Sequence, residues 1–244
     1  MNKYIKLIPL PLREAIRVLL FGKNHHQDLA RFLSVIGAKT MFDVGAEAGY
    51  ETILAAKRGI KVFAFEPTPR ALKTLEANVK AEKIAPLVTI VPKAVSDFNG
   101  QAEFFFAGQN TLVPSENCES TKVDVITLAS FIKETGSFPD FVKVDAEGAN
   151  LGVIKGLPFG EKKPKILSVE YEAHETEIEK ILRENGYGLL YALYRPVRKD
   201  HRAIFWKYST TPDFTNGVWG DIIAVDLPLF AQFKEFVKLV DFKN

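Results

Sequence analysis

The sequence predicts an α/β protein in which helices cover both faces of a mostly parallel β-sheet. Short apolar runs typical of buried strands alternate with segments of helical periodicity through most of the 244 residues. Parallel strands need crossover connections, which are usually helices, so this alternation indicates a parallel sheet. The hydrophobic content of 47% is enough for a substantial core. No linker-like stretch clearly separates two domains.

The expected strands are apolar runs bounded by glycine, proline or acidic residues. They cover Met41–Val44, Ile60–Phe65, Val88–Val91, Gln101–Ala107, Phe141–Asp145, Ile166–Tyr171, Tyr187–Tyr194 and Ile222–Val225. The expected helices carry apolar residues at helical spacing, and Thr68 followed by Pro69 is typical of a helix start. They cover Leu12–Phe21, Asp28–Ile36, Tyr50–Arg58, Pro69–Glu82, Val123–Glu134, a segment through Leu151, Val153 and Ile154, His174–Asn185 and Leu229–Val240. Two stretches, Gly108–Thr121 and Arg195–Gly220, are predicted to be irregular.

Composition narrows the classes of function. The formal net charge of +2 argues against an obligate nucleic-acid-binding protein. Cys118 is the single cysteine, so an internal disulfide and a thiolate zinc cluster are excluded, and we expect a reducing, cytoplasmic location. Pro9 and Pro11 interrupt the first apolar run, and no stretch approaches the roughly 20 apolar residues of a membrane span. The amphipathic helix Leu12–Phe21 is expected to pack on the main domain, with peripheral membrane contact as the alternative.

The expected strand Met41–Val44 leads into a glycine-rich turn that suits a ligand site. Gly45 and Gly49 would let the backbone turn sharply and approach a ligand closely, and the next helix offers free N–H groups at its start. The glycine spacing is not the Gly-x-Gly-x-x-Gly of dinucleotide-binding folds. Glu66, however, follows Asp43 at an offset close to the ~20 residues at which such folds place a ribose-binding acid. A nucleoside site without a pyrophosphate cradle is what S-adenosylmethionine (SAM) requires. Each signal alone also fits a structural turn or a solvated acid.

Acidic residues recur at the carboxyl ends of the expected strands. Those at or near such ends are Asp43, Glu66, Asp97, Asp145 and Glu170. In open parallel sheets the ligand binds beyond the carboxyl ends of the strands, at the point where the strand order reverses. The sequence therefore predicts that these acids contribute to one site.

Five segments of the chain follow one another in the order seen in a single enzyme family. They are Phe42-Asp43-Val44-Gly45-Ala46-x-x-Gly49, Ala64-Phe65-Glu66-Pro67, Ala94-Val95-Ser96-Asp97, Val142-Lys143-Val144-Asp145-x-Glu147-Gly148-Ala149 and Lys165-Ile166-Leu167-Ser168-Val169-Glu170. Over roughly residues 40–195 the chain resembles the FkbM family of SAM-dependent methyltransferases. The resemblance implies a Rossmann-like, seven-stranded class I methyltransferase fold and O-methylation of sugars, polysaccharide units or polyketide hydroxyls. We expect residues 1–37 to form an N-terminal helical extension and residues 38–244 to form the SAM-dependent methyltransferase domain.

Three positions depart from the family pattern. Glu47 stands where the family mostly has Asn, Asn150 where it usually has Glu, and Ala129 where an Asp is common. A carboxylate at position 47 could face the methionine carboxylate of SAM, and like charges in a cleft repel each other.

The resemblance and the spacing together define the candidate cofactor-binding residues. They are Asp43, Gly45, Ala46, Gly49, Glu66, Pro67, Ser96, Asp97 and Asp145. Glu66 is expected to accept hydrogen bonds from both ribose hydroxyls. Asp97 follows the family pattern for binding the adenine amino group, or it only forms a turn before Asn99-Gly100. Asp43 is expected to anchor the first loop or to meet the methionine ammonium; alternatively, it fastens the loop without touching a ligand.

Methyl transfer to a hydroxyl needs alignment and, for a weakly acidic acceptor, a general base. Asp145 is the first candidate, followed by Glu147, Glu170 and His174, although His174 could instead face solvent at a helix start. Two or more of these acids could alternatively hold Mg²⁺, which prefers oxygen ligands. The stretch Arg195–Gly220 is either a solvated loop or a grip for an anionic or sugar acceptor. The residues that suggest such a grip are Arg195, Arg198, Lys199, His201, Arg202, Trp206 and Trp219.

The leading hypothesis is a cytoplasmic SAM-dependent O-methyltransferase that acts on a hydroxyl of a sugar, a glycan precursor or a similar small molecule. One alternative is a non-catalytic nucleoside-binding or scaffold protein that keeps the fold without the chemistry. The other is an NAD-type oxidoreductase, against which the missing Gly-x-Gly-x-x-Gly argues.

Overall fold

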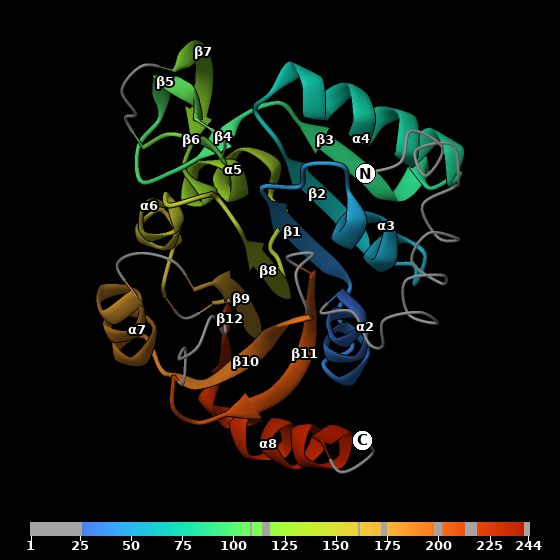
Figure 1. Ribbon diagram of the computed structural model, residues 1–244, viewed down its shortest axis with the longest axis vertical. Helices are drawn as coiled ribbons and strands as arrows, with labels where there is room; N and C mark the ends of the chain where they lie inside the picture. Colours follow the sequence, from blue (N-terminus) through green and yellow to red (C-terminus); the bar gives the residue numbers. More distant parts are fainter. Residues whose placement is uncertain are drawn as a thin grey trace.

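A large sheet of eight strands forms the centre of the described part of the protein (Figure 1). The computed structural model describes residues 26–107, 109–113, 118–160, 162–171, 175–197, 202–212 and 219–241. The strand order is β11-β10-β12-β9-β8-β1-β2-β3. The strands are β1 (Thr40–Val44), β2 (Lys61–Phe65), β3 (Val88–Val91), β8 (Phe141–Val144), β9 (Ile166–Glu170), β10 (Tyr187–Val197), β11 (Arg202–Ser209) and β12 (Trp219–Asp226).

The five strands β3, β2, β1, β8 and β9 are parallel neighbours. β12 is antiparallel to β9, and β10 and β11 continue the sheet as further antiparallel neighbours. The chain leaves β1 toward β2 on one side and later returns to β8 on the other, so the strand order reverses at β1 and β8. The predicted α/β fold with a mostly parallel sheet is confirmed, and this reversal marks the edge where a ligand is expected.

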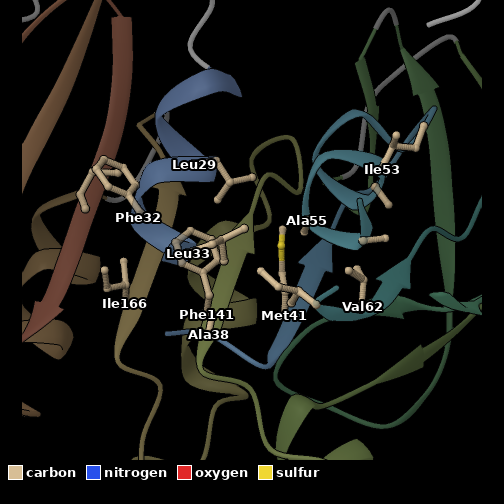
Figure 2. Packing of buried hydrophobic residues seen from close by; sticks show 14 of the residues in the cluster. Leu29, Phe32, Leu33, Ala38, Met41, Ile53, Ala55, Val62, Phe141 and Ile166 are labelled. Atoms are coloured by element: carbon tan, nitrogen blue, oxygen red, sulfur yellow. The ribbon is translucent and has the colours of Figure 1, made fainter. Parts of the chain in front are cut away.

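Helices cover both faces of the large sheet (Figure 1). One face carries α2 (His26–Val35), α3 (Tyr50–Ala56), α4 (Pro69–Ala81) and α8 (Leu227–Asp241). The other carries α5 (Leu128–Thr135), α6 (Asn150–Lys155) and α7 (Glu175–Glu184). On the first face, Leu29 and Leu33 of α2 pack with Met41 of β1 and Phe141 of β8 (Figure 2). On the second face, the ring of Phe131 lies 4.9–5.4 Å from the ring centroids of three sheet residues, namely Phe42, Phe63 and Phe65.

A second sheet of four strands stands beside the ends of the parallel strands, next to α5 and α6 (Figure 1). Its order is β4-β7-β5-β6, with β4 (Ala94–Val95), β5 (Gly100–Ala107), β6 (Gln109–Thr111) and β7 (Glu119–Ile126), and a 3-10 turn η2 (Ala85–Leu87) precedes β3. Phe104, Val123 and Val125 form part of its core. Thr111 Oγ1 donates a hydrogen bond to the Glu147 carbonyl (2.5 Å), so this sheet is attached to the loop after β8.

Three predicted segments differ from the structure. The helix predicted from Val123 to Glu134 is wrong in its first part, because β7 runs to Ile126 and α5 begins at Leu128. Within β7, Val123 and Val125 are buried and Asp124 is exposed, which is the alternation of a strand. Gly108–Thr121 contains β6 and the start of β7.

The stretch Arg195–Gly220 is also more regular than predicted, because β10 continues to Val197, β11 follows, and β12 begins at Trp219. Its regularity comes from pairing with β10, a contact between distant residues that local composition does not reveal. The helix predicted at Leu12–Phe21 lies outside the described residues. None of the helices in the described ranges is long and apolar enough to cross a bilayer.

Candidate functional site

A cavity of about 420 Å³, hereafter the first cavity, lies at the carboxyl ends of β1, β2 and β8. Three loops, the second sheet and the first residues of α3 and α4 line it. The lining includes Gly45, Ala46 and Glu47 after β1, Glu66, Pro67 and Thr68 after β2, and Asp145, Ala146 and Glu147 after β8. It also includes Val95 and Phe104 of the second sheet and Leu112 directly after β6. Polar groups therefore come from the loops after the parallel strands, and an apolar wall comes from the second sheet.

The loop after β1 is shaped by close packing against its neighbours. The N–H groups of Gly45 and Ala46 both donate to the Phe65 carbonyl at 3.0 Å. Gly45 has a positive φ of 76°, and a Cβ at this position would overlap the Asp145 carbonyl oxygen. A glycine is required here because the loops after β1 and β8 touch, in addition to any approach by a ligand.

The Glu66 carboxylate is held in one orientation at the wall of the first cavity. Its Oε1 accepts hydrogen bonds from Thr68 N (2.9 Å) and Thr68 Oγ1 (2.7 Å), and its Oε2 accepts one from Glu47 N (3.0 Å). Thr68 precedes α4 as predicted, but its hydroxyl binds Glu66 rather than capping the helix. A carboxylate has about four lone-pair sites, so Oε2 keeps room for a further donor.

Glu47 lies beside Glu66 and adds negative charge to the same wall. Burial raises the pKa of Glu47, and the neighbouring Glu66 charge raises it further. Its backbone is in the left-handed region, with φ 47°, which is unusual for a residue with a side chain. The hydrogen bond from its N–H to Glu66 joins the loops after β1 and β2 at this point.

A largely buried lysine, Lys143, connects the acid of β1 with the acid that follows β8. Asp43 and Lys143 are direct partners in the register of these strands. Lys143 Nζ lies 3.1 Å from Asp145 Oδ2 and 3.8 Å from Asp43 Oδ1, and it donates to the Gly45 carbonyl at 3.0 Å. Asp43 is fully buried, and its Oδ2 accepts a hydrogen bond from Thr52 Oγ1 at 2.5 Å. Lys143 therefore connects Asp43 and Asp145 to the loop after β1.

The protonation of this cluster follows from burial and from the lysine. Burial raises the pKa of Asp43 to about 6, although Lys143 opposes the rise. Burial also acts to raise the pKa of Asp145, but Lys143 outweighs it and holds that pKa below its ordinary value. Burial alone would lower the pKa of Lys143, but Asp145, Glu51 and Asp43 raise it above its ordinary value. Lys143 is therefore cationic and Asp145 anionic at neutral pH.

The structure brings together part of the predicted set. Of the predicted cofactor and catalytic residues, those that line the first cavity are Gly45, Ala46, Glu66, Pro67, Asp145 and Glu147. Those that do not line it are Asp43, Gly49, Ser96, Asp97 and Glu170. His174 and much of the predicted acceptor grip lie outside the described residues. The contacts of Asp43 match the alternative of an acid that fastens the loop.

Gly49 and Ser96, two predicted residues outside the lining, have packing roles. Gly49 precedes α3 with φ 84°, and a Cβ there would overlap the side chain of Leu75. Ser96 is buried and donates to Asp97 Oδ1 (3.3 Å). A Cβ on Gly152 of α6 would overlap the Ser96 hydroxyl, so α6 packs closely on this turn.

A second, smaller cavity of about 110 Å³ adjoins the first. Glu51, Lys143 and Asp145 line both cavities. The predicted residue Glu170 lines the second cavity together with Ser168, Tyr194, Trp219 and Asp221. Sequence reasoning did not select Asp221 or Lys143. Each is a charged residue in an apolar run, Asp221 at the start of β12 and Lys143 inside β8. A charge within an apolar run is the sequence signal that could have identified both residues.

The described residues contain no group of three or more His, Cys, Asp or Glu side chains that could hold a metal ion. Asp145 is instead paired with the Lys143 ammonium, Glu66 accepts from the Glu47 N–H, and Asp221 accepts from the Tyr194 hydroxyl. The expectation of Mg²⁺ has no support from this arrangement.

Comparison with known families decides the classification. Residues 43–189, more than half of the chain, match the methyltransferase FkbM domain. The chain belongs to the FkbM methyltransferase family. No curated protein is significantly similar in sequence to this FkbM-family chain.

Solved structures of methyltransferases share the fold of this FkbM-family chain. Precorrin-6y C5,15-methyltransferase from Geobacter metallireducens GS-15 is similar with a TM-score of 0.52 and 15% identity, over 85% of this chain and 92% of that one. Methyltransferase FkbM from Methylobacillus flagellatus KT has a TM-score of 0.49 and 20% identity, over 77% of this chain and 43% of that one. The predicted Rossmann-like class I methyltransferase fold is confirmed, with β11 as an eighth strand at the edge of the sheet.

Proposed function

We propose that this FkbM-family protein is a SAM-dependent O-methyltransferase that modifies a hydroxyl of a sugar, a glycan precursor or a similar metabolite. The observation that carries the proposal is the fixed Glu66 carboxylate at the wall of the first cavity, beside the loop Gly45–Glu47. Bound SAM supplies a methyl group on a sulfonium, which an oxygen nucleophile accepts as it loses its proton.

The residues of the first cavity fit this group. A volume of about 420 Å³ falls within the range of about 300–1,000 Å³ that ligand pockets occupy. The remaining lone pair on Glu66 Oε2 can accept a ribose hydroxyl, because Thr68 and Glu47 leave that site open. Phe104 and Leu112 give the apolar wall that an adenine ring needs.

The carboxylates near the reversal of strand order suit transfer to oxygen rather than to an unactivated carbon. A hydroxyl must lose a proton during transfer, and acids with shifted pKa values in a cleft are the groups that accept one. Lys143 holds Asp145 as an anion and fixes its position at the junction of the two cavities. Trp219 lies in the wall of the second cavity, where its ring could pack against the face of a sugar. This favours a sugar as the acceptor.

Isothermal titration calorimetry with SAM and with its product S-adenosylhomocysteine (SAH) tests the cofactor assignment. The Glu66→Ala variant should bind each ligand about 10- to 100-fold more weakly, the effect of losing a hydrogen bond to a charged group. The Glu66→Gln variant keeps an oxygen acceptor, so it separates the contact of Glu66 with the ligand from its hydrogen bonds to the loops. The matched control is Glu76→Ala, because Glu76 is exposed on α4. Unchanged SAM affinity in Glu66→Ala would remove Glu66 from this role.

Transfer itself is tested with tritiated SAM and a panel of methyl glycosides, nucleotide sugars and cell-envelope glycans. Incorporation of label into a hydroxyl, identified by mass spectrometry of the product, is the expected result. Tight SAM binding without transfer to any class of acceptor would instead favour the non-catalytic alternative.

A further inference from the structure

Asp221 lines the second cavity, and the proposed methyl transfer assigns no role to it. Asp221 is near the start of β12, which runs antiparallel to β9 and places Asp221 opposite Glu170. The start of β12 therefore lies at the edge of the sheet where the parallel strands end. Lys143 and Asp145 line both cavities, so Asp221 faces a space that adjoins the first cavity.

The carboxylate of Asp221 is held by an aromatic residue of the neighbouring strand. Tyr194 on β10 donates from its hydroxyl to Asp221 Oδ2 at 3.2 Å. The rings of Tyr194 and Trp219 pack at 5.0 Å between centroids. Both rings line the second cavity with Asp221. This arrangement suits a sugar, because the aromatic rings can pack against the sugar ring and the carboxylate can accept a hydrogen bond from a sugar hydroxyl.

The charges around Asp221 place its titration near neutrality. The titratable groups that face it are Glu51 of α3, Lys143 and Asp145 at the end of β8, Glu170 of β9 and Tyr194 of β10. Burial raises the pKa of Asp221 to about 7, Asp145 and Glu51 add to the rise, and Tyr194 and Lys143 oppose it. A group that titrates near the working pH can take a proton and afterwards release it to water.

Two other acids of the site, Asp145 and Asp43, are less suited to this task. Asp145 lies 3.1 Å from the Lys143 ammonium, which stabilises its anion and makes it a weak proton acceptor. Asp43 accepts the Thr52 hydroxyl and lines neither cavity. The Asp221 carboxylate accepts a hydrogen bond from a neutral phenol, that of Tyr194, and its remaining lone pairs keep acceptor capacity toward the cavity.

We propose that Asp221 is the catalytic residue that takes the proton from an acceptor hydroxyl bound in the second cavity, an assignment that rests on the proposed function. The hydroxyl oxygen bonds to the transferred methyl carbon while its O–H bond breaks and the proton moves to an Asp221 carboxylate oxygen. The bond between methyl carbon and sulfur breaks with both electrons on sulfur. The carboxylate becomes a neutral acid and then returns the proton to water.

The first test needs no acceptor. Protein labelled with ¹³C at the aspartate carboxyl carbons is titrated by NMR with SAH present, and the signal missing in Asp221→Asn identifies the residue. We expect a midpoint near pH 7. Tyr194→Phe removes a hydrogen bond that favours the anion, so the midpoint should rise by about one pH unit. An Asp221 signal that titrates at the ordinary aspartate value of 3.8 would overturn the proposal.

The second test is the pH profile of tritium transfer from labelled SAM to methyl glycosides. Wild-type kcat/KM should rise with pH through about 7 and then level, because the carboxylate must be ionised. The kcat of Asp221→Asn should be about 100- to 10,000-fold lower than that of the wild type. Its pH profile should lack the rising limb, and its affinity for SAM should be unchanged. Asp226→Asn, at the far end of β12 in an ion pair with Lys163 (2.9 Å), is the matched control and should keep the wild-type profile.

The outcomes separate this proposal from the proposed function. Wild-type protein that binds no SAM in calorimetry contradicts the function itself. Wild-type protein that binds SAM and transfers methyl groups, with Asp221→Asn within threefold of it and showing the same pH limb, contradicts only the role of Asp221.

Discussion

Substitution of Gly45 by alanine should destabilise the protein through two separable effects. The backbone at Gly45 has φ 76°, a conformation that costs an L-residue about 1–2 kcal/mol. The added Cβ would also overlap the Asp145 carbonyl oxygen, so the loops after β1 and β8 would have to separate. Forced overpacking typically costs about 1–3 kcal/mol. The free energy of unfolding of Gly45→Ala should therefore fall by about 2–5 kcal/mol.

Gly59→Ala is the matched control for the conformational effect. Gly59 has φ 79°, but a Cβ there would meet nothing within 4 Å. It should lose only about 1–2 kcal/mol, so the difference between the two variants measures the contact between the loops. Equilibrium unfolding in urea gives both values, and calorimetry with SAH should show weakened binding in Gly45→Ala alone, because the Gly45 carbonyl holds Lys143. Equal losses in the two variants would refute the packing argument.

Two further changes test the buried polar groups of the site. The pKa of Asp43 rises from 3.8 to about 6 on folding, so the folded state retains a proton that the unfolded chain has lost between these values. Wild-type stability should therefore fall by roughly 3 kcal/mol, relative to Asp43→Asn, between about pH 4 and pH 7 in urea unfolding; wild-type stability that stays constant or rises with pH relative to the variant would contradict the raised pKa. Asn150 is buried, accepts from Ala146 N at 2.8 Å and donates to the Glu170 carbonyl at 3.1 Å. Asn150→Asp sets a carboxylate against that carbonyl and should lower the free energy of unfolding by about 2 kcal/mol or more at pH 7, and equal stability in urea would refute it.

The parallel half of the fold could be predicted because its strands are buried on both faces. Strands such as β1 and β2 then become short, nearly continuous apolar runs that stand out from the surrounding helices. β7 was misassigned because only one of its faces is buried, and Val123 and Val125 with Ile126 and Leu128 also fit a helical spacing. β11 was missed because its structure depends on pairing with β10, which the sequence alone does not display.

The same distinction explains what could be predicted of the candidate site. Glu66 and Asp145 were found because parallel strands bring their carboxyl ends to one edge, which is a rule about strand order. Asp221 reaches that edge from the opposite direction, at the start of an antiparallel strand, so a search of strand ends passes over it. Lys143 was visible only as a motif residue until the register placed it opposite Asp43.

The charges of the site favour the ligand that we propose. Lys143 is one cation among Asp43, Asp145 and Glu51, and it neutralises only part of their negative charge. A sulfonium placed at the junction of the two cavities would meet this residual negative charge, in a region where burial strengthens electrostatic interactions. Transfer of the methyl group would leave a neutral thioether and, in our proposal, a neutral Asp221, so the attraction that holds the donor would end with the reaction. Lys143 then has a reason to be buried there: it keeps Asp145 ionised and leaves the proton to Asp221.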